Sequence, residues 1–203
     1  MTISLQDRER ISNTIRSAEA KTSGEIVCVL AETSTNSTAM PTILAAATAL
    51  ALPWLLVIFT QMTVYRILSL QILVFIAAFA ILCLPRVRVA LMPRRVRRTV
   101  AHHTAMEQFT IRGLARKKDR SSILVFVSLA ERYARIIADE GIAARVPQSQ
   151  WQAAIDALVA HMRDGRIAEG FVTAIELCGN ELAKQFPRSE PNRNELPDRI
   201  YLI

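Results

Sequence analysis

The residues of this chain whose types and spacing could do chemistry are acidic side chains at the two ends of one apolar segment. Glu131 and Arg132 lie in a short break between two apolar segments, and Asp139 and Glu140 follow the second of these. Carboxylates surrounded by oxygen ligands suit Ca²⁺ or Mg²⁺ rather than zinc. The three carboxylates are therefore a candidate metal site, with Arg132 as a phosphate or charge partner. The competing interpretation, which the sequence favours, is a hairpin turn at Glu131 and a solvated loop acid at Asp139.

Phosphate-ester hydrolysis is a reaction that these residues could support. It needs a nucleophile or an activated water, together with positive groups that stabilise the transferred phosphoryl group. Arg132 could supply the charge, and Asp119 or Asp139 the nucleophile. Ser128 lies inside an apolar segment with no histidine near it in sequence, so its hydroxyl is more simply a satisfied core group. Neither a glycine-rich phosphate loop nor a CxxxxxR motif is present, and the catalytic residues stay unknown.

The histidines and cysteines are not spaced as metal ligands. His102 and His103 are adjacent, so on a helix their side chains point about 100° apart and do not easily bind one metal. Cys28, Cys83 and Cys178 are dispersed, with no CxxC pair and no His/Cys cluster. This pattern predicts three buried thiols rather than a zinc site.

A long apolar stretch, Pro41–Leu84, organises the elements that must position these residues, and its only formal charge is Arg66. Pro41–Thr60 and Ile67–Leu84 are each close to the roughly 20 apolar residues that cross a bilayer as a helix. The polar break Gln61–Arg66 allows a tight turn between them. A backbone in lipid must satisfy its own hydrogen bonds, and neither segment has the polar face of a surface helix. We therefore predict a transmembrane helical hairpin rather than a pair of buried core helices.

The net charge of +7 has a local origin, because an arginine run follows the hairpin and no acidic residue occurs until Glu107. Basic residues near a membrane end orient a protein with that end in the cytoplasm and attract anionic headgroups at about 1 kcal/mol per charge. With only Arg66 in the hairpin loop, both termini are expected in the cytoplasm. Single-stranded nucleic-acid sites interleave aromatic with basic residues, and this run has none, so no nucleic-acid partner is expected. The expected headgroup contacts are Arg86, Arg88, Arg94, Arg95, Arg97 and Arg98.

The segments on either side of the hairpin predict one α/β domain, because neither half has a sheet alone. The expected elements are a helix after Ser4, the strand Glu25–Ala31, a helix from Pro93 to Gly113, the strands Ile123–Leu129 and Tyr133–Ala138, and two helices ending near Gly165 and Pro187.

The predicted domain boundaries follow from these elements. Residues 1–39 and 86–187 form the two parts of the cytoplasmic domain, residues 40–85 form the hairpin with spans 41–60 and 67–84 and loop 61–66, and residues 188–203 form a C-terminal tail. The apolar end of the tail, Ile200–Ile203, is expected to dock on the domain, the membrane or a partner.

Three segments resemble the TPM domain family. Residues 22–29, TSGEIVCV, resemble its TSGEI strand entry, and residues 122–132, SILVFVSLAER, resemble its GxLxxxSxxER segment. Asp139–Ile142 resembles the D-x-G-I that follows. The resemblance implies an α/β/α sandwich with a small mixed sheet. It is nearest to short bacterial membrane proteins with a hairpin inside the domain, which implies the bacterial inner membrane.

The family resemblance also implies functions. The family includes thylakoid-lumen proteins implicated in photosystem II repair; some members are described as acid phosphatases and some as binding divalent metal through acidic residues at loop ends. By motif match, these properties would be carried here by Glu25, Glu131, Arg132 and Asp139. The sequence departs from the family at Ser121–Ser122, where relatives usually have glycine.

Three functional hypotheses follow. The preferred one is a membrane-anchored binding or accessory module for assembly, repair or quality control of a membrane complex. Its hairpin, with small residues between Ala45 and Ala51, would dock on another membrane protein or on itself. The alternative is a divalent-metal-dependent phosphatase at the cytoplasmic membrane face. A third is a lipid-surface sensor that uses the arginine run.

Overall fold

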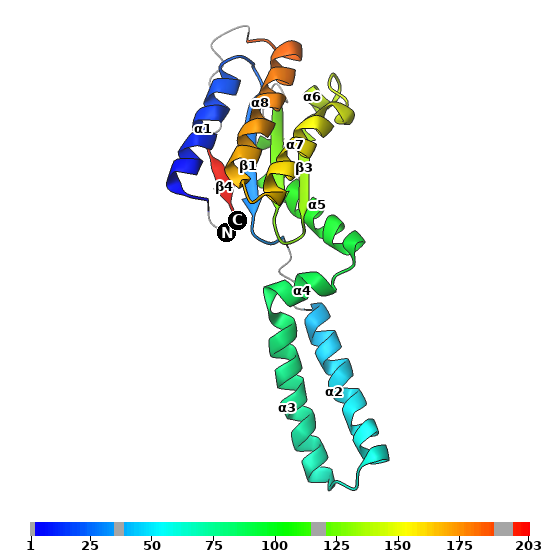
Figure 1. The fold of residues 1–203 in the computed structure, drawn as a ribbon. Coiled ribbons are helices and arrows are strands. Elements are labelled where there is room, and N and C mark those ends of the chain that lie inside the picture. Colours follow the sequence, from blue (N-terminus) through cyan, green and yellow to red (C-terminus); the bar gives the residue numbers. More distant parts are fainter. Residues whose placement is uncertain (1–2, 35–38, 115–120, 189–196) are drawn as a thin grey trace. The chain divides into compact units, whose positions relative to one another are not determined.

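The computed structural model describes residues 3–34, 39–114, 121–188 and 197–203 (Figure 1). The chain divides into two compact units, which are described separately. One combines Met1–Ser34 with Val100–Ile203, and the other is Thr35–Thr99. The first unit thus contains sequence from both sides of the apolar stretch.

A mixed sheet lies at the centre of the first unit. The described residues form four strands in the order β3-β2-β1-β4. Strands β2 and β4 run parallel to β1, and β3 runs antiparallel to β2. Every residue of β1 and β2 is buried, as expected for central strands covered on both faces. The strands are β1 Glu25–Ala31, β2 Ser122–Ser128, β3 Tyr133–Ala138 and β4 Ile200–Leu202.

Strand β4 shows where the apolar C-terminus docks. It adds an edge strand beside β1, and the backbone N–H of Ile203 donates to the carbonyl of Leu30 at 3.0 Å. The segment expected to be a tail therefore ends as part of the sheet. Residues 189–196 of this expected tail lie outside the described part of the chain.

Helices pack on both faces of the sheet, which confirms the α/β/α sandwich. On one face, α1 (Leu5–Glu19), α7 (Gln152–Arg163) and α8 (Ile167–Gln185) cover the larger core together with Trp151 (Figure 1). On the other face, Ala105 and Phe109 of α5 (Arg94–Ile111) pack on Val27, Val29, Leu124 and Phe126. The short helices are α6 Glu140–Ala143 and the 3₁₀ helix Gln148–Trp151.

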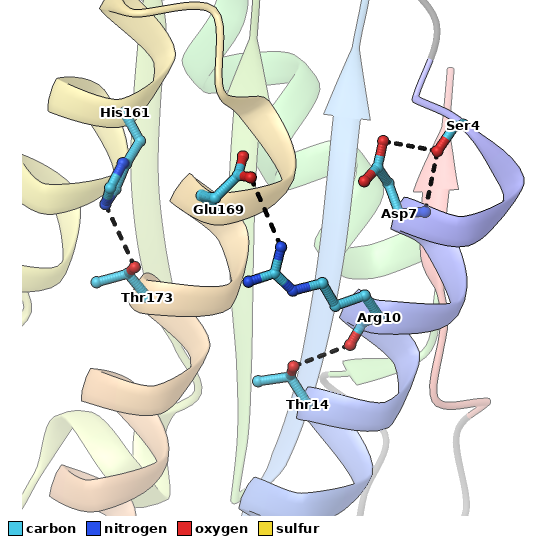
Figure 2. A network of polar contacts seen from close by, with 7 residues as sticks. All are labelled: Ser4, Asp7, Arg10, Thr14, His161, Glu169 and Thr173. Atoms are coloured by element: carbon cyan, nitrogen blue, oxygen red, sulfur yellow. Dashed lines mark hydrogen bonds and ion pairs between the residues drawn. The ribbon is translucent and has the colours of Figure 1, made fainter.

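Polar contacts join the helices of the larger face at their solvent side (Figure 2). Arg10 of α1 forms an ion pair with Glu169 of α8 at 3.6 Å, and His161 of α7 lies 3.4 Å from the hydroxyl of Thr173 on α8. Ser4 caps the start of α1 with its side-chain oxygen. Exposed pairs of this kind contribute about 0–1 kcal/mol each, so the apolar core holds these helices together.

Helices α1 and α8 cross closely at Gly179, where a Cβ atom would lie 2.7 Å from the Cβ of Ala18. We expect Gly179→Ala to lower the free energy of unfolding by about 1–2 kcal/mol, because overpacking outweighs the better helix propensity of alanine. Adding Ala18→Gly should restore part of the loss. Chemical denaturation of the four proteins of this double-mutant cycle measures the coupling, and strictly additive effects would contradict the close contact.

The second unit is built from α2 (Ala39–Phe59), α3 (Val64–Cys83) and the short helix α4 (Pro85–Leu91). Among the described helices, two are long and apolar enough to span a membrane, over Pro41–Phe59 and Val64–Cys83. Their windows are only 11% and 6% buried, unlike core helices of a soluble domain. The turn is shorter than the expected loop 61–66, because α3 begins at Val64.

Candidate functional site

The three carboxylates of the predicted metal site lie at opposite ends of β3. Ser128 pairs with Tyr133 at one end of the β2–β3 ladder, where the turn carries Glu131, and Asp139 and Glu140 follow the other end. A six-residue strand is about 20 Å long. One ion therefore cannot bind Glu131 together with Asp139 and Glu140. Within the described ranges, no group of three His, Cys, Asp or Glu side chains could hold a metal ion.

Glu131 is a buried hydrogen-bond acceptor with only 4% of its surface exposed. It accepts from the Thr33 hydroxyl at 3.2 Å and from the backbone N–H of Ser34 at 3.0 Å, and the Ser128 hydroxyl also donates to it. The hydroxyls of Ser34 and Ser128 lie 2.9 Å apart. Glu131 therefore fastens the β2–β3 turn to the segment that leaves β1. The sequence showed the turn but gave no sign that its acid is buried.

Arg132, the last residue of this turn, has a left-handed backbone with φ of +52°. Its N–H donates to the carbonyl of Leu129 at 3.2 Å, which closes the turn, and its side chain is exposed. This conformation normally favours glycine. Arginine therefore occupies a position where the fold alone would prefer another residue, which points to a use of its side chain.

We expect Arg132→Gly to raise the free energy of unfolding by about 0.5–1 kcal/mol, because glycine adopts φ > 0 without a Cβ penalty. Thermal denaturation checks this, with Arg132→Ala as the matched control. Alanine removes the same side chain but keeps the Cβ, so it should give no stabilisation. Equal effects of the two substitutions would show that the backbone at residue 132 is not strained.

A groove beside this turn brings Arg132 near a second cation. The groove has a volume of about 540 Å³ and lies between the end of the β2–β3 hairpin and the last turns of α7, with Arg163 as its other charged lining residue. Two permanently charged guanidinium groups can bind phosphate or carboxylate oxygens. Sequence reasoning had singled out Arg132 but missed Arg163, because nothing along the chain links α7 to the turn.

At the opposite end of the sheet, Glu25, Ser122 and Asp139 lie side by side on β1, β2 and the end of β3. Glu25 pairs with Ser122 in the parallel ladder, and the Asp139 N–H donates to the Ser122 carbonyl at 2.9 Å. All three are buried, at 3%, 0% and 7% exposure. Asp139 also accepts from the Glu140 N–H at 2.8 Å and caps α6, while the Glu140 side chain is exposed. We name this set the Glu25–Ser122–Asp139 row.

The row has the donor chemistry of a hard-cation site. Two carboxylates and a hydroxyl offer oxygen ligands of the kind that Ca²⁺ and Mg²⁺ take, although Ca²⁺ needs six to eight and the row supplies only part of them. The residues therefore fit such an ion in type. Glu25 and Asp139 had each been singled out from the family motifs, but their convergence on Ser122 required the sheet register.

A further acidic pair, Glu19 and Asp198, lies close to Glu25 and was not predicted. Glu19 is half-buried at the end of α1 and accepts the backbone N–H of Ile26 at 2.7 Å. Burial raises the pKa of Glu19 to about 8, with further contributions from Asp198 and Glu25. Asp198 also pairs with Arg16 at 3.3 Å. Asp198 is near the C-terminus, so no local pattern joins it to α1.

The predicted arginine run lies in α4 and α5. In α5, Arg94, Arg95 and Arg98 are exposed and Arg97 is half-buried. Arg86 and Arg88 lie in α4, but their side chains are outside the described part of the chain, as is Asp119.

The histidine pair does not converge on one ligand. The ring nitrogen Nδ1 of His102 lies 3.4 Å from the Tyr133 hydroxyl, and the His102 and His103 ring centroids are 6.5 Å apart. Burial lowers the pKa of His102. His102 thus contacts Tyr133 of β3 rather than sharing a ligand with His103.

Comparison with known proteins places these residues in a family context. A family model described as the TPM domain matches residues 84–181, which include Ser128, Glu131, Arg132 and Asp139. Among solved structures, the NMR structure of the BA42 protein from the psychrophilic bacterium Bizionia argentinensis is similar, with a TM-score of 0.64 and 20% sequence identity. The match covers all of this chain and 97% of that one, and at this identity it shows the fold alone. No curated protein matches the chain.

Proposed function

We propose that this chain, which matches the TPM domain family model over residues 84–181, is a membrane-anchored TPM-domain module that binds another membrane protein and assists the assembly, repair or quality control of a complex. The observation that carries this proposal is the exposed apolar surface of α2 and α3. Large side chains such as Trp54, Phe59 and Tyr65 are at least three-quarters exposed. So much exposed apolar surface is unfavourable in water and is expected in lipid.

The arginine asymmetry supports an orientation with both termini in the cytoplasm of a bacterial inner membrane. The end of the hairpin where α2 meets α3 carries only Arg66, in the first turn of α3, whereas the arginine run follows α3. This distribution fits the positive-inside rule, and the exposed arginines of α5 would contact anionic headgroups. A cysteine introduced at Met62, in a variant that lacks Cys83 and keeps the buried Cys28 and Cys178, tests the orientation. Labelling by an impermeant thiol reagent from the outer side supports the topology, and labelling only from the cytoplasmic side overturns it.

The small residues of α2 divide into two sets. Ala45 and Ala49 are buried, so they belong to the packing of the hairpin itself. Ala47 and Ala51, one helical turn apart, are exposed. Small residues at this spacing allow a second helix to approach closely. We therefore assign the face of Ala47 and Ala51 to the contact with a partner membrane protein or a second copy.

A cross-linking experiment tests this assignment. A photoreactive amino acid at Ala47 should give a discrete protein adduct in membranes, whereas the same probe at Val57, which is exposed but lies about 80° or more around the helix from Ala47 and Ala51, should react mainly with lipid. Ala47→Leu with Ala51→Leu should abolish co-purification of the partner in mild detergent. Recovery of the wild-type chain alone and monomeric, with no adduct from either position, would refute the binding-module proposal.

The alternative function is a divalent-metal-dependent phosphatase at the cytoplasmic membrane face, favoured by the Glu25–Ser122–Asp139 row. Phosphate release from a generic phosphomonoester with Mg²⁺ or Ca²⁺ should be lost in a Glu25→Gln, Asp139→Asn variant. It should be retained in Glu140→Gln, because that side chain is exposed. No turnover, or equal turnover in all three proteins, would remove this alternative.

A further inference from the structure

The groove between the β2–β3 turn and α7 combines an apolar lining with a cationic rim. The apolar lining comes from Val127, Leu129 and Ala134 of the hairpin and from Val159 and Met162 of α7. A soluble phosphate site would not need such a surface, because small anions are held by donors alone. The lining therefore suits a ligand that carries an apolar chain.

The charged residues among the described lining are Arg132 and Arg163, and both side chains are exposed. Arg163 lies in the last turn of α7, where the helix dipole favours a cation. Arg132 holds the left-handed conformation at the end of the turn. The two guanidinium groups are thus supplied by different elements at one groove, and their charge is complementary to an anionic head beside an apolar chain.

The groove is at the end of the sheet from which the chain departs for the hairpin. Ser128, which lines the groove, contacts Ser34 through the two hydroxyls at 2.9 Å. Residues 35–38 alone separate Ser34 from α2. The groove therefore belongs to the end of the domain that is tied to the proposed membrane anchor.

From these observations we propose that the groove binds one anionic phospholipid, with its phosphate between Arg132 and Arg163 and the first part of an acyl chain along Val159 and Met162. This inference rests on the proposed membrane attachment, because the bilayer supplies the ligand. It goes further by assigning a specific lipid site on the folded domain, separate from the arginines of α5. Occupancy would hold the domain against the membrane surface.

The test uses the full-length chain in a mild non-ionic detergent and counts bound lipid by native mass spectrometry. The probe is dioctanoyl phosphatidylglycerol, compared with dioctanoyl phosphatidylcholine and with glycerol 3-phosphate. We expect one phosphatidylglycerol per chain to be lost in Arg132→Gln, Arg163→Gln, with apparent affinity weakened about tenfold or more. The charge-matched control is Arg135→Gln, Arg145→Gln, which removes two exposed arginines outside the groove and should keep that lipid.

Met162→Gln separates the chain contact from the headgroup contact. It should weaken phosphatidylglycerol binding several-fold without changing the weak binding of glycerol 3-phosphate. Equal loss of lipid in the control pair, or no loss in the groove pair, would overturn the proposal. Competition by glycerol 3-phosphate at the same concentration as the lipid would also overturn it, because the ligand would then be a soluble anion.

Failure of the membrane proposal would appear in a different experiment. Alkaline carbonate would then release the chain from cell membranes. The binding measurement does not depend on that result, since the lipid is added to purified protein.

Discussion

Replacing Glu131 with alanine should lower the free energy of unfolding of the α/β unit by about 3–4 kcal/mol. The carboxylate is buried and accepts hydrogen bonds from Thr33, Ser34 and Ser128. Its loss would leave buried donors without an acceptor, at about 1–3 kcal/mol each for those that water cannot reach. Denaturant unfolding followed by the fluorescence of buried Trp151, in a Trp54→Phe background, measures the change.

Glu140→Ala is the matched control for this prediction, because Glu140 is an exposed acid at the other end of β3. It should change stability by no more than about 0.5 kcal/mol. Hydrogen exchange adds a local readout, since the Ser34 amide bonded to Glu131 should exchange much faster in Glu131→Ala. Equal destabilisation by the two variants, with an unchanged Ser34 amide, would mean that the Glu131 contacts contribute little.

The same residue illustrates what sequence reasoning could and could not reach. Glu25–Ala31 and Tyr133–Ala138 were predicted with the bounds that the structure gives, and β2 differs by one residue at each end. These segments are short and mainly apolar, with β-branched residues in each, so local composition decides their conformation. For Glu131, by contrast, the local sequence predicts only an acidic residue in a short hairpin turn. It is buried because Thr33 and Ser34, almost 100 positions earlier, lie against it.

The unpredicted parts of the candidate sites have the same physical cause. Glu25 and Asp139 converge on Ser122 only through the register of three strands, and Arg163 meets Arg132 only through the packing of α7 on the hairpin. Sheet register and helix packing are non-local, so spacing along the chain does not contain them. The apolar C-terminus was recognised as a docking segment, but its choice of β1 as a neighbour could not be read from its composition.

Glu19 gives the second large prediction, a loss of stability as the pH rises. The native state raises the pKa of this carboxyl from 4.5 to about 8, chiefly through burial and then through the neighbouring Asp198 and Glu25. Between these pH values the folded protein binds more protons than the unfolded chain does. Stabilisation by the Glu19 proton is therefore complete below pH 4.5, declines as the pH rises from there, and is fully lost once the pH has risen through about 8.

The expected loss is about 2–4 kcal/mol, allowing for solvent at the half-buried carboxyl. The charged groups that face Glu19 set the size of this loss of stability. Ionised Glu19 would face Asp198 and Glu25, while Arg16 on the same helix and Arg188 across the small cavity offset part of the repulsion. The buried Cys28 thiol nearby does not titrate in this range, because burial raises its pKa well above the usual value.

Thermal unfolding of the wild type and of Glu19→Gln between pH 5 and pH 9 separates the effect of titrating Glu19 from the effects of all other titrating groups. The wild-type Tm should fall progressively relative to the variant between pH 5 and about pH 8 and then level off, because glutamine keeps the hydrogen bond to Ile26 but cannot ionise. The effect should extend to β4, since Asp198 lies two residues before the start of that strand. Protection of the Ile203 amide, which bonds to Leu30, should therefore fall at pH 9 in the wild type only, relative to the intrinsic exchange rate at that pH. Parallel curves for the two proteins would instead mean that Glu19 is ionised throughout and that another group controls the C-terminal strand.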